Sequence, residues 1–220
     1  MLTPRIHFTK FKIKKQSYKI KNELKLILKE NIQVIHSLTK KYKNNFIKKN
    51  ISKYKKLKNY RIIGMGGSSL GAQAIYDFLK PKINKKFEFL DNLRPHNKNL
   101  SNSNTLNLII SKSGNTLETI VNSNIYIKKK QQNIFITENK KSYLHILAEK
   151  LKAEIIHHNN FIGGRYSVLS EVGMLPAELM GLNISKFKQL NNELLELQLT
   201  IGSKLTPVLA DGAVKLAKFI

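Results

Sequence analysis

Four hydroxyl side chains lie close together in one short polar stretch of the sequence. They fall within nine residues, directly after the predicted strand 106–110, and are Ser111, Ser113, Thr116 and Thr119. Hydroxyl groups and unpaired backbone amides are the groups that the oxygens of a phosphate monoester require. The stretch is consistent with a phosphate-binding turn, or with a polar loop in which Asn115 or Thr116 merely caps a helix.

A second candidate turn is rich in glycine. Residues 64–71, Gly-Met-Gly-Gly-Ser-Ser-Leu-Gly, follow the apolar residues Ile62 and Ile63. Glycine lets the backbone turn sharply and approach a ligand closely. We expect Ser68 and Ser69 to cap a helix that runs to about Phe78. The start of such a helix presents N–H groups and a positive partial charge to an anion.

The order of the predicted elements brings the two turns together. The expected strands are 61–63, 87–90, 106–110, 134–136 and 155–156, and helices follow the first, third and fourth of them. This alternation predicts βαβ units and a doubly wound parallel α/β sheet. In such a sheet the turns after the first and third strands meet at the topological switch point. The pair of turns therefore favours a phosphate pocket over an isolated capped helix.

Arg165 is the most informative single residue. It follows Gly163 and Gly164 and is one of four arginines in a chain with 39 lysines and arginines. Beside a phosphate pocket an arginine stabilises a developing oxyanion, whereas elsewhere it is an ordinary surface residue or the partner of a carboxylate. We expect His157 and His158 to be polar loop or core residues. No His, Asp or Glu cluster has metal-ligand spacing, so no metal is predicted.

A dinucleotide-binding fold is the alternative to a phosphate pocket. Gly64 and Gly66 match the start of its fingerprint, but Ser69 stands where the third glycine belongs. Asp91 follows the second strand, where a ribose-binding acid is expected. This alternative leaves the hydroxyl-rich stretch and the Gly-Gly-Arg segment unexplained.

Composition limits the remaining classes of function. The 220 residues include no cysteine, which excludes disulfide scaffolds and thiolate chemistry, and no apolar run of the ~20 residues that a membrane span needs. No secretory signal is evident, so a cytoplasmic protein is predicted. The net charge of +25 comes from scattered lysines. We expect the basic run 40–58 to be a solvated helix face and predict neither nucleic acid nor membrane as a partner.

The chain is predicted to have three parts. Residues 1–59 form a basic helical segment, 60–160 the α/β domain, and 161–220 a Gly-Gly-Arg turn and the helices of a second domain that ends incomplete. The expected helices outside the α/β domain are 17–46, 168–180, 186–199 and 207–219.

Three segments together resemble the phosphoglucose isomerase family. Residues 64–71 are similar to its first signature turn, and Ser-Lys-Ser-Gly-Asn-Thr-Leu-Glu-Thr at 111–119 is similar to its phosphate loop, SKTxTTxET. Gly-Gly-Arg-Tyr-Ser at 163–167 is similar to its GGRxS segment. The resemblance covers about residues 61–182 and is closest to the shorter bacterial enzymes. It implies a sugar-isomerase-type (SIS) sheet of about five strands and a homodimer.

The resemblance also implies an activity and its residues. The expected reaction interconverts glucose 6-phosphate and fructose 6-phosphate through an enediol(ate), without a cofactor. Arg165 would stabilise the enediolate, and Gly67 and Ser68 would contact the sugar phosphate. The 6-phosphate would be held by the stretch Ser111, Lys112, Ser113, Gly114, Asn115 and Thr116.

The family's general base is a glutamate downstream of the GGRxS segment, and its ring-opening histidine lies further on. We find no matching segment in this sequence, so we expect the 220-residue chain to be the N-terminal portion of an isomerase that binds substrate but turns it over poorly. A non-catalytic sugar-phosphate-binding module or regulator is the alternative, followed by the dinucleotide-binding enzyme.

Overall fold

A computed structural model of the chain describes residues 22–23, 26–27, 30, 32–93, 104–128 and 131–201, with side chains described up to residue 193. The chain divides into two compact units, residues 43–184 and residues 1–42 together with 185–220. Every residue considered above for phosphate binding lies in the unit 43–184.

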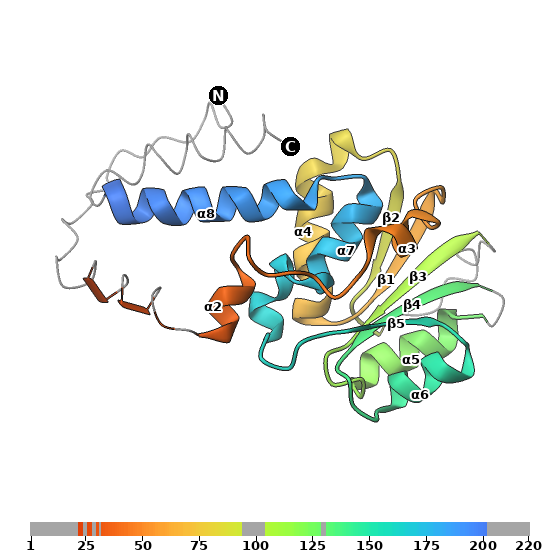
Figure 1. Cartoon of the computed structure of the whole chain (residues 1–220). Helices are drawn as coiled ribbons and strands as arrows, with labels where there is room; N and C mark the ends of the chain where they lie inside the picture. The colour runs from red at the N-terminus through yellow and green to blue at the C-terminus, as the bar shows by residue number, and fades with distance from the viewer. Residues whose placement is uncertain are drawn as a thin grey trace. The chain divides into compact units, whose positions relative to one another are not determined.

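A five-stranded parallel sheet forms the centre of this unit (Figure 1). In spatial order its strands are β2 (Lys86–Leu90), β1 (Asn59–Ile63), β3 (Thr105–Ile110), β4 (Gln132–Thr137) and β5 (Glu154–His157). All six residues of the central strand β3 are buried, as expected for a strand covered on both faces. The predicted doubly wound α/β sheet and its five strands are confirmed.

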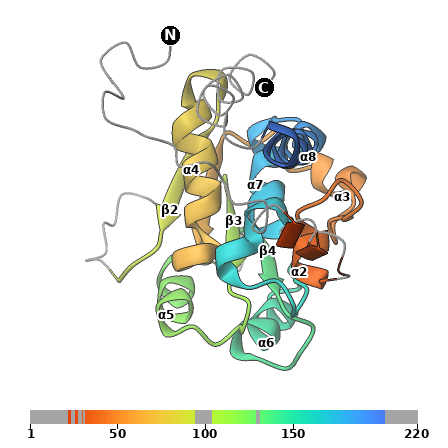
Figure 2. The same ribbon diagram turned by 90° about the vertical axis from the view of Figure 1, so that its left-hand side faces the viewer.

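Helices cover both faces of the sheet. They are α4 (Leu70–Leu79), α5 (Leu117–Tyr126), α6 (Tyr143–Lys150) and α7 (Glu171–Met180). Figures 1 and 2 show α5 and α6 on one side and α4 and α7 on the other. On the first face Ile63, Ile109 and Phe135 pack against Tyr126 of α5 and Leu144 of α6. The two helix layers keep water away from the strands and leave their carboxyl ends as the accessible edge.

The opposite face carries aromatic residues. The ring of Tyr60 stacks on Phe87, and the ring of Tyr76 in α4 lies 5.4 Å from Phe87 and 5.9 Å from Phe89. Helix α7 packs beside α4 and ends at Gly181, which has φ +91, a conformation that glycine adopts without strain.

A row of polar side chains crosses the sheet on its α5 face. The strand register places Glu88, Arg61, Asn107 and Asn133 side by side on β2, β1, β3 and β4. Arg61 Nε donates to Glu88 Oε2 at 2.8 Å, and Asn107 Nδ2 donates to Asn133 Oδ1 at 2.8 Å. Arg61 is 1% exposed, and its Cζ lies 5.1 Å from the centre of the Tyr126 ring. Because a one-residue slip would separate these buried groups, the row favours a single register.

Some helix predictions outside the sheet are wrong. Of the described residues in 17–46, positions 22–23 and 26–27 and α2 (Gln33–Ser37) are helical, and residues 38–46 are not. The basic run 40–58 holds only the short helix α3 (Lys48–Ser52), and Tyr54 is buried with its hydroxyl donating to Glu154 Oε2 at 3.1 Å. Most side chains of this run are exposed, as expected, but the run is helical only in α3, and Ile51 and Tyr54 pack on the protein. The helix predicted at 207–219 lies outside the described residues.

In the second unit, α8 (Ile184–Ile201) lies against the segment that follows α2. Lys188 Nζ donates to Tyr42 O at 2.8 Å, and Asn191 Nδ2 donates to Leu38 O at 2.9 Å. The helix predicted at 186–199 is present within α8. The three-part division at 59/60 and 160/161 stays a prediction.

The polar row makes Arg61 a testable position. Arg61→Ala leaves Glu88 and Asn107 without their guanidinium partner, so we expect the free energy of unfolding to fall by about 3 kcal/mol. Urea unfolding followed by circular dichroism measures this loss. Lys86→Ala, at an exposed position of β2, is the control, with an expected effect below about 0.5 kcal/mol. Equal losses in the two variants would contradict a stabilising role for the row.

Candidate functional site

The carboxyl ends of β1 and β3 lie side by side where the winding of the sheet changes direction. The order β2-β1-β3-β4-β5 places the switch point between β1 and β3. A Cβ atom built on Gly64 would lie 2.8 Å from Ile110 O, so the two turns begin in contact. The expected meeting of the turns is confirmed. The same order disfavours the dinucleotide alternative, whose sheet pairs its first strand with its fourth.

The hydroxyl-rich turn is folded by its own polar groups. Ser111 Oγ lies 2.9 Å from Thr116 Oγ1 and accepts a hydrogen bond from the amide of Gly114 at 3.2 Å. Gly114 has φ +68, and a Cβ atom there would lie 2.0 Å from Ser142 Oγ. Glycine is therefore required at this position, where the backbone of the turn packs closely against Ser142.

Ser113 and Asn115, also in this turn, have different hydrogen-bond partners. Ser113 is exposed, and its Oγ accepts from the amide of Asn115 at 3.2 Å. The side chain of Asn115 is used elsewhere, because its Oδ1 accepts from the amide of Tyr143 at 2.9 Å, at the start of α6. Asn115 therefore has its backbone rather than its side-chain oxygen to offer a ligand.

The helix N-termini at the switch point lack side-chain caps. Ser69 and Thr116 occupy the N-cap positions of α4 and α5, and neither side chain accepts a cap hydrogen bond. By contrast, Ser142 caps α6 and Ser170 caps α7. The prediction that Ser68 and Ser69 cap a helix is therefore wrong: Ser69 Oγ instead donates to Gly66 O at 3.3 Å. The first-turn amides of α4 and α5 therefore donate no hydrogen bond to these two side chains.

The Gly-Gly-Arg turn contacts the first glycine turn through the backbone. A Cβ atom on Gly67 would lie 2.3 Å from Gly164 O, so only glycine fits there. Ser167 Oγ lies 3.1 Å from Gly67 O and 2.8 Å from Gly164 O. Residues 164–169 form a 3-10 helix rather than the start of the predicted helix 168–180, which begins as α7 at Glu171. Arg165 is exposed on this turn. The turn 64–69 thus touches both other motifs.

Lys112 connects the hydroxyl-rich turn to the ends of β4 and β5. Its backbone oxygen accepts from the amide of Glu138 at 3.1 Å, and its Nζ lies 3.6 Å from Glu138 Oε1. Lys112 Nζ also donates to Asn160 O. In this arrangement the Lys112 ammonium is held toward β4 and β5, while its backbone stays in the turn.

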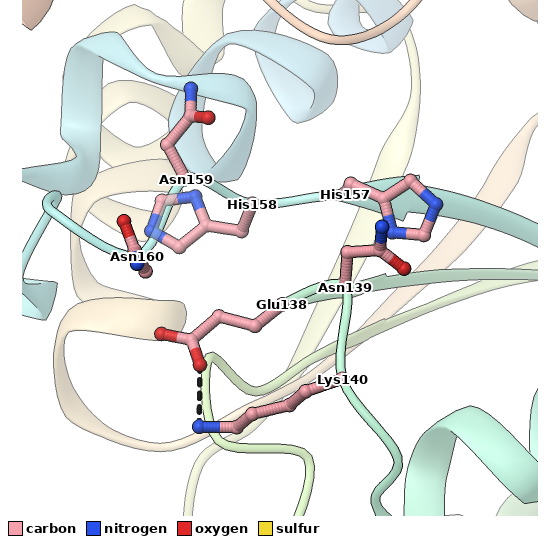
Figure 3. Close-up of a pocket in the computed structure, with 7 residues that line it drawn as sticks. All are labelled: Glu138, Asn139, Lys140, His157, His158, Asn159 and Asn160. Atoms are coloured by element: carbon pink, nitrogen blue, oxygen red, sulfur yellow. Dashed lines mark ion pairs between the residues drawn. The ribbon is translucent and has the colours of Figure 1, made fainter.

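A cavity of about 420 Å³ lies at this end of the sheet (Figure 3). Glu138 and Lys140 form one wall, with Lys140 Nζ 2.5 Å from Glu138 Oε2, and His158 and Asn160 form the facing wall. Burial alone would raise the pKa of Glu138, but the ammonium groups of Lys140 and Lys112 outweigh it and hold the pKa below its usual value. The carboxylate is therefore ionised and paired near neutral pH.

Sequence reasoning missed Glu138. Its only sequence signal is its place directly after the fourth strand, which puts it at the same sheet edge as Ser111. His158 was expected to be a loop or core residue, and it is buried.

Comparison with known proteins identifies the family. A family model described as phosphoglucose isomerase matches residues 27–196. The chain belongs to the phosphoglucose isomerase family. Within this family, the glucose-6-phosphate isomerase of Methanocaldococcus jannaschii is 39% identical over 152 residues, which cover 62% of this chain and 37% of that enzyme. That of Campylobacter jejuni is 37% identical over 142 residues, covering 58% and 35%. The chain thus spans about a third of the length of these two relatives.

Solved structures agree with the sugar-isomerase-type fold that the phosphoglucose isomerase resemblance implies. A hypothetical protein of Thermus thermophilus superposes with a TM-score of 0.68 at 21% identity, covering 86% of this chain and 49% of that one. The tagatose-6-phosphate ketose/aldose isomerase of Escherichia coli superposes with a TM-score of 0.56 at 14% identity, covering 87% and 57%.

The described residues were searched for metal-binding groups and for membrane-spanning helices. Within it, no group of three or more His, Asp or Glu side chains is placed to hold a metal ion. Within the same residues, no helix has the length and apolar character needed to span a membrane.

The contact between Gly67 and Gly164 predicts effects of different size for two similar substitutions. Gly67→Ala forces a methyl group into the Gly164 backbone, so we expect a loss of about 1–3 kcal/mol in the free energy of unfolding. Gly163→Ala is the matched control: its φ is −72, and its Cβ would meet only Tyr166, at 3.6 Å. There we expect a change below about 1 kcal/mol, of either sign. Urea unfolding of both variants tests this, and a Gly67→Ala protein as stable as wild type would contradict the contact.

The lowered pKa of Glu138 predicts a pH dependence. A carboxyl whose pKa is lower in the folded state contributes stability above its unfolded value, near 4.5, and loses that contribution as the pH falls through the folded value. Urea unfolding at about pH 6.5 and about pH 3.5 should therefore show wild type more stable than Glu138→Gln at the higher pH, with a smaller difference at the lower. A difference independent of pH would contradict the assignment.

Proposed function

We propose that this chain carries the sugar-phosphate-binding part of a glucose-6-phosphate isomerase, which interconverts glucose 6-phosphate and fructose 6-phosphate through an enediol(ate) without a cofactor. One observation carries the proposal: the two helices that start at the switch point lack side-chain caps, whereas α6 and α7 have them. Helix N-termini with free amides attract anions, and a phosphate group supplies the acceptor oxygens that these amides need.

In this proposal the 6-phosphate binds the turn 111–116 through backbone amides and the hydroxyls of Ser111, Ser113 and Thr116. Gly67 and Ser68 contact the substrate from the turn 64–71. The small size of Gly67 lets this turn lie against the backbone of Gly164. The positive field of the lysine-rich chain favours the anionic substrate.

Arg165 stabilises the negative charge that develops on the enediolate oxygen. Its support is its place on a turn whose backbone touches Gly67, and its exposed side chain. We assign the general base to none of the described residues. A cytoplasmic homodimer completes the proposal.

Calorimetric titration of the full 220-residue chain tests the binding step. We expect fructose 6-phosphate to bind and NAD not to bind. Ser113→Ala removes one hydroxyl donor to the phosphate and should weaken binding about tenfold. Ser52→Ala, an exposed serine whose hydroxyl donates to Lys49 O within α3, is the matched control and should bind as wild type does. Binding of NAD alone would overturn the proposal.

The same samples also test whether the chain turns the substrate over. Conversion of fructose 6-phosphate to glucose 6-phosphate, followed in a coupled assay, would support isomerase activity in this chain. Tight binding with little or no conversion is the result expected of a chain in which no described residue is assigned as the general base.

A further inference from the structure

One buried imidazole touches both ends of the turn that carries Arg165. His158 follows β5, and its side chain is 2% exposed at the wall of the cavity in Figure 3. Its Nε2 lies 3.2 Å from Ile162 O, and its Nδ1 lies 3.3 Å from Glu171 Oε1. Ile162 and Glu171 directly flank the turn 163–170, so this single ring spans its base.

The two ring nitrogens of His158 make different contacts. A carbonyl oxygen only accepts hydrogen bonds, so Nε2 of His158 carries a proton and donates it to Ile162 O. On the other side, Nδ1 lies 3.3 Å from Glu171 Oε1, a close polar contact that lacks hydrogen-bond geometry. The Glu171 side chain is 0% exposed, so the imidazole is a polar neighbour of this buried carboxyl group.

The use of both ring nitrogens decides what His158 does. A histidine that acts as a general acid or base needs a nitrogen within reach of the substrate. Here Nε2 faces Ile162 O and Nδ1 faces Glu171 Oε1. The ring is therefore built to hold protein segments together and not to exchange protons with a ligand.

The centre of the turn is held by hydrogen bonds of Ser167 and Ser170. Ser167 Oγ lies within hydrogen-bonding distance of Gly67 O, and Ser170 Oγ donates to Ser167 O at 2.7 Å. The turn is thus fixed to the first glycine turn in its middle and closed at its base by His158. Arg165 lies between these two attachments, and among the described residues none forms an ion pair with it.

We infer that His158 is a positioning residue for Arg165: by joining Ile162 to Glu171 it closes the turn 163–170 and holds the guanidinium at the sugar-phosphate site. The expected effect of His158 on sugar-phosphate affinity rests on the proposed function. The closure of the turn by His158 does not depend on any ligand. Displacement of a contact group by about 1 Å substantially weakens its effect on a bound substrate. Loosening the base of the turn should therefore change the affinity for the sugar phosphate measurably.

A double variant separates positioning from folding. His158→Phe with Glu171→Leu replaces both polar partners by apolar groups of similar size, a change that leaves stability unchanged or raised in comparable buried pairs. In calorimetry on the full chain we expect it to bind fructose 6-phosphate about tenfold more weakly than wild type. The single variant Glu171→Gln keeps a polar neighbour for Nδ1 and should retain near wild-type affinity. His157→Gln, at the exposed neighbouring histidine, is the matched control.

A double-mutant cycle with Arg165→Ala shows whether His158 acts through Arg165. If it does, the His158→Phe, Glu171→Leu change should have less than a twofold effect on affinity once Arg165 is alanine. An unchanged affinity in the double variant, or an equal loss in both backgrounds, would overturn the inference. Should the double variant fail to fold, His158→Gln takes its place, since one amide group does not reach both Ile162 O and Glu171.

Hydrogen exchange makes the test independent of the ligand. The amides of residues 163–170 should exchange about tenfold faster in the variant, while those of β1 and β3 stay protected. If wild type does not bind fructose 6-phosphate, the proposed function fails, yet this exchange experiment still decides whether His158 closes the turn. Unchanged exchange at 163–170 would overturn the closure itself.

Discussion

The pairing of β1 with β3 is the constraint on which the candidate site depends. Both turns of the site begin where these strands end, and Gly64 meets Ile110 O only in the observed register. A shift by one residue would turn Arg61 and Asn107 to opposite faces and separate the buried polar groups that now bond across four strands. The polar row on the strands that lead into the two turns therefore favours the register that aligns the strand ends, and with it the contact between the turns.

Glycine then allows these aligned ends to approach more closely than other residues would. Gly67 lies against the Gly164 backbone, and Gly114 lies against Ser142 with φ +68. Each contact joins segments far apart in the sequence: Gly67 packs the first motif on the third, and Gly114 packs the second motif on Ser142 at the start of α6. The first motif thus contacts the third through Gly67 and the strand before the second through Gly64.

The sheet and the meeting of its turns were predictable because both follow from local signals: apolar runs, glycine turns and the fixed handedness of βαβ units. The role of Ser69 was not predictable. A serine directly before a helix is a typical cap, and the sequence does not show that its hydroxyl instead donates to Gly66 O. The pairs Lys112–Glu138 and His158–Glu171 were also missed, since each joins residues from separate elements and no spacing in the sequence relates them. Likewise, the lysine-rich run 40–58 conceals buried Ile51 and Tyr54, which charge counting does not reveal.

The helices at this sheet edge differ in their N-terminal caps, and the difference bears on their stability. A serine or threonine cap contributes about 1 kcal/mol, and Ser142 and Ser170 supply it for α6 and α7. Ser69 and Thr116 have the right chemistry and position to do the same for α4 and α5, yet the hydroxyl of Ser69 faces Gly66 O and that of Thr116 faces Ser111. The chain thus gives up a local stabilisation at the two helices that converge on the switch point. A bound phosphate would restore it, because its oxygens take the place of the missing cap, so ligand binding and helix stability are expected to be coupled there.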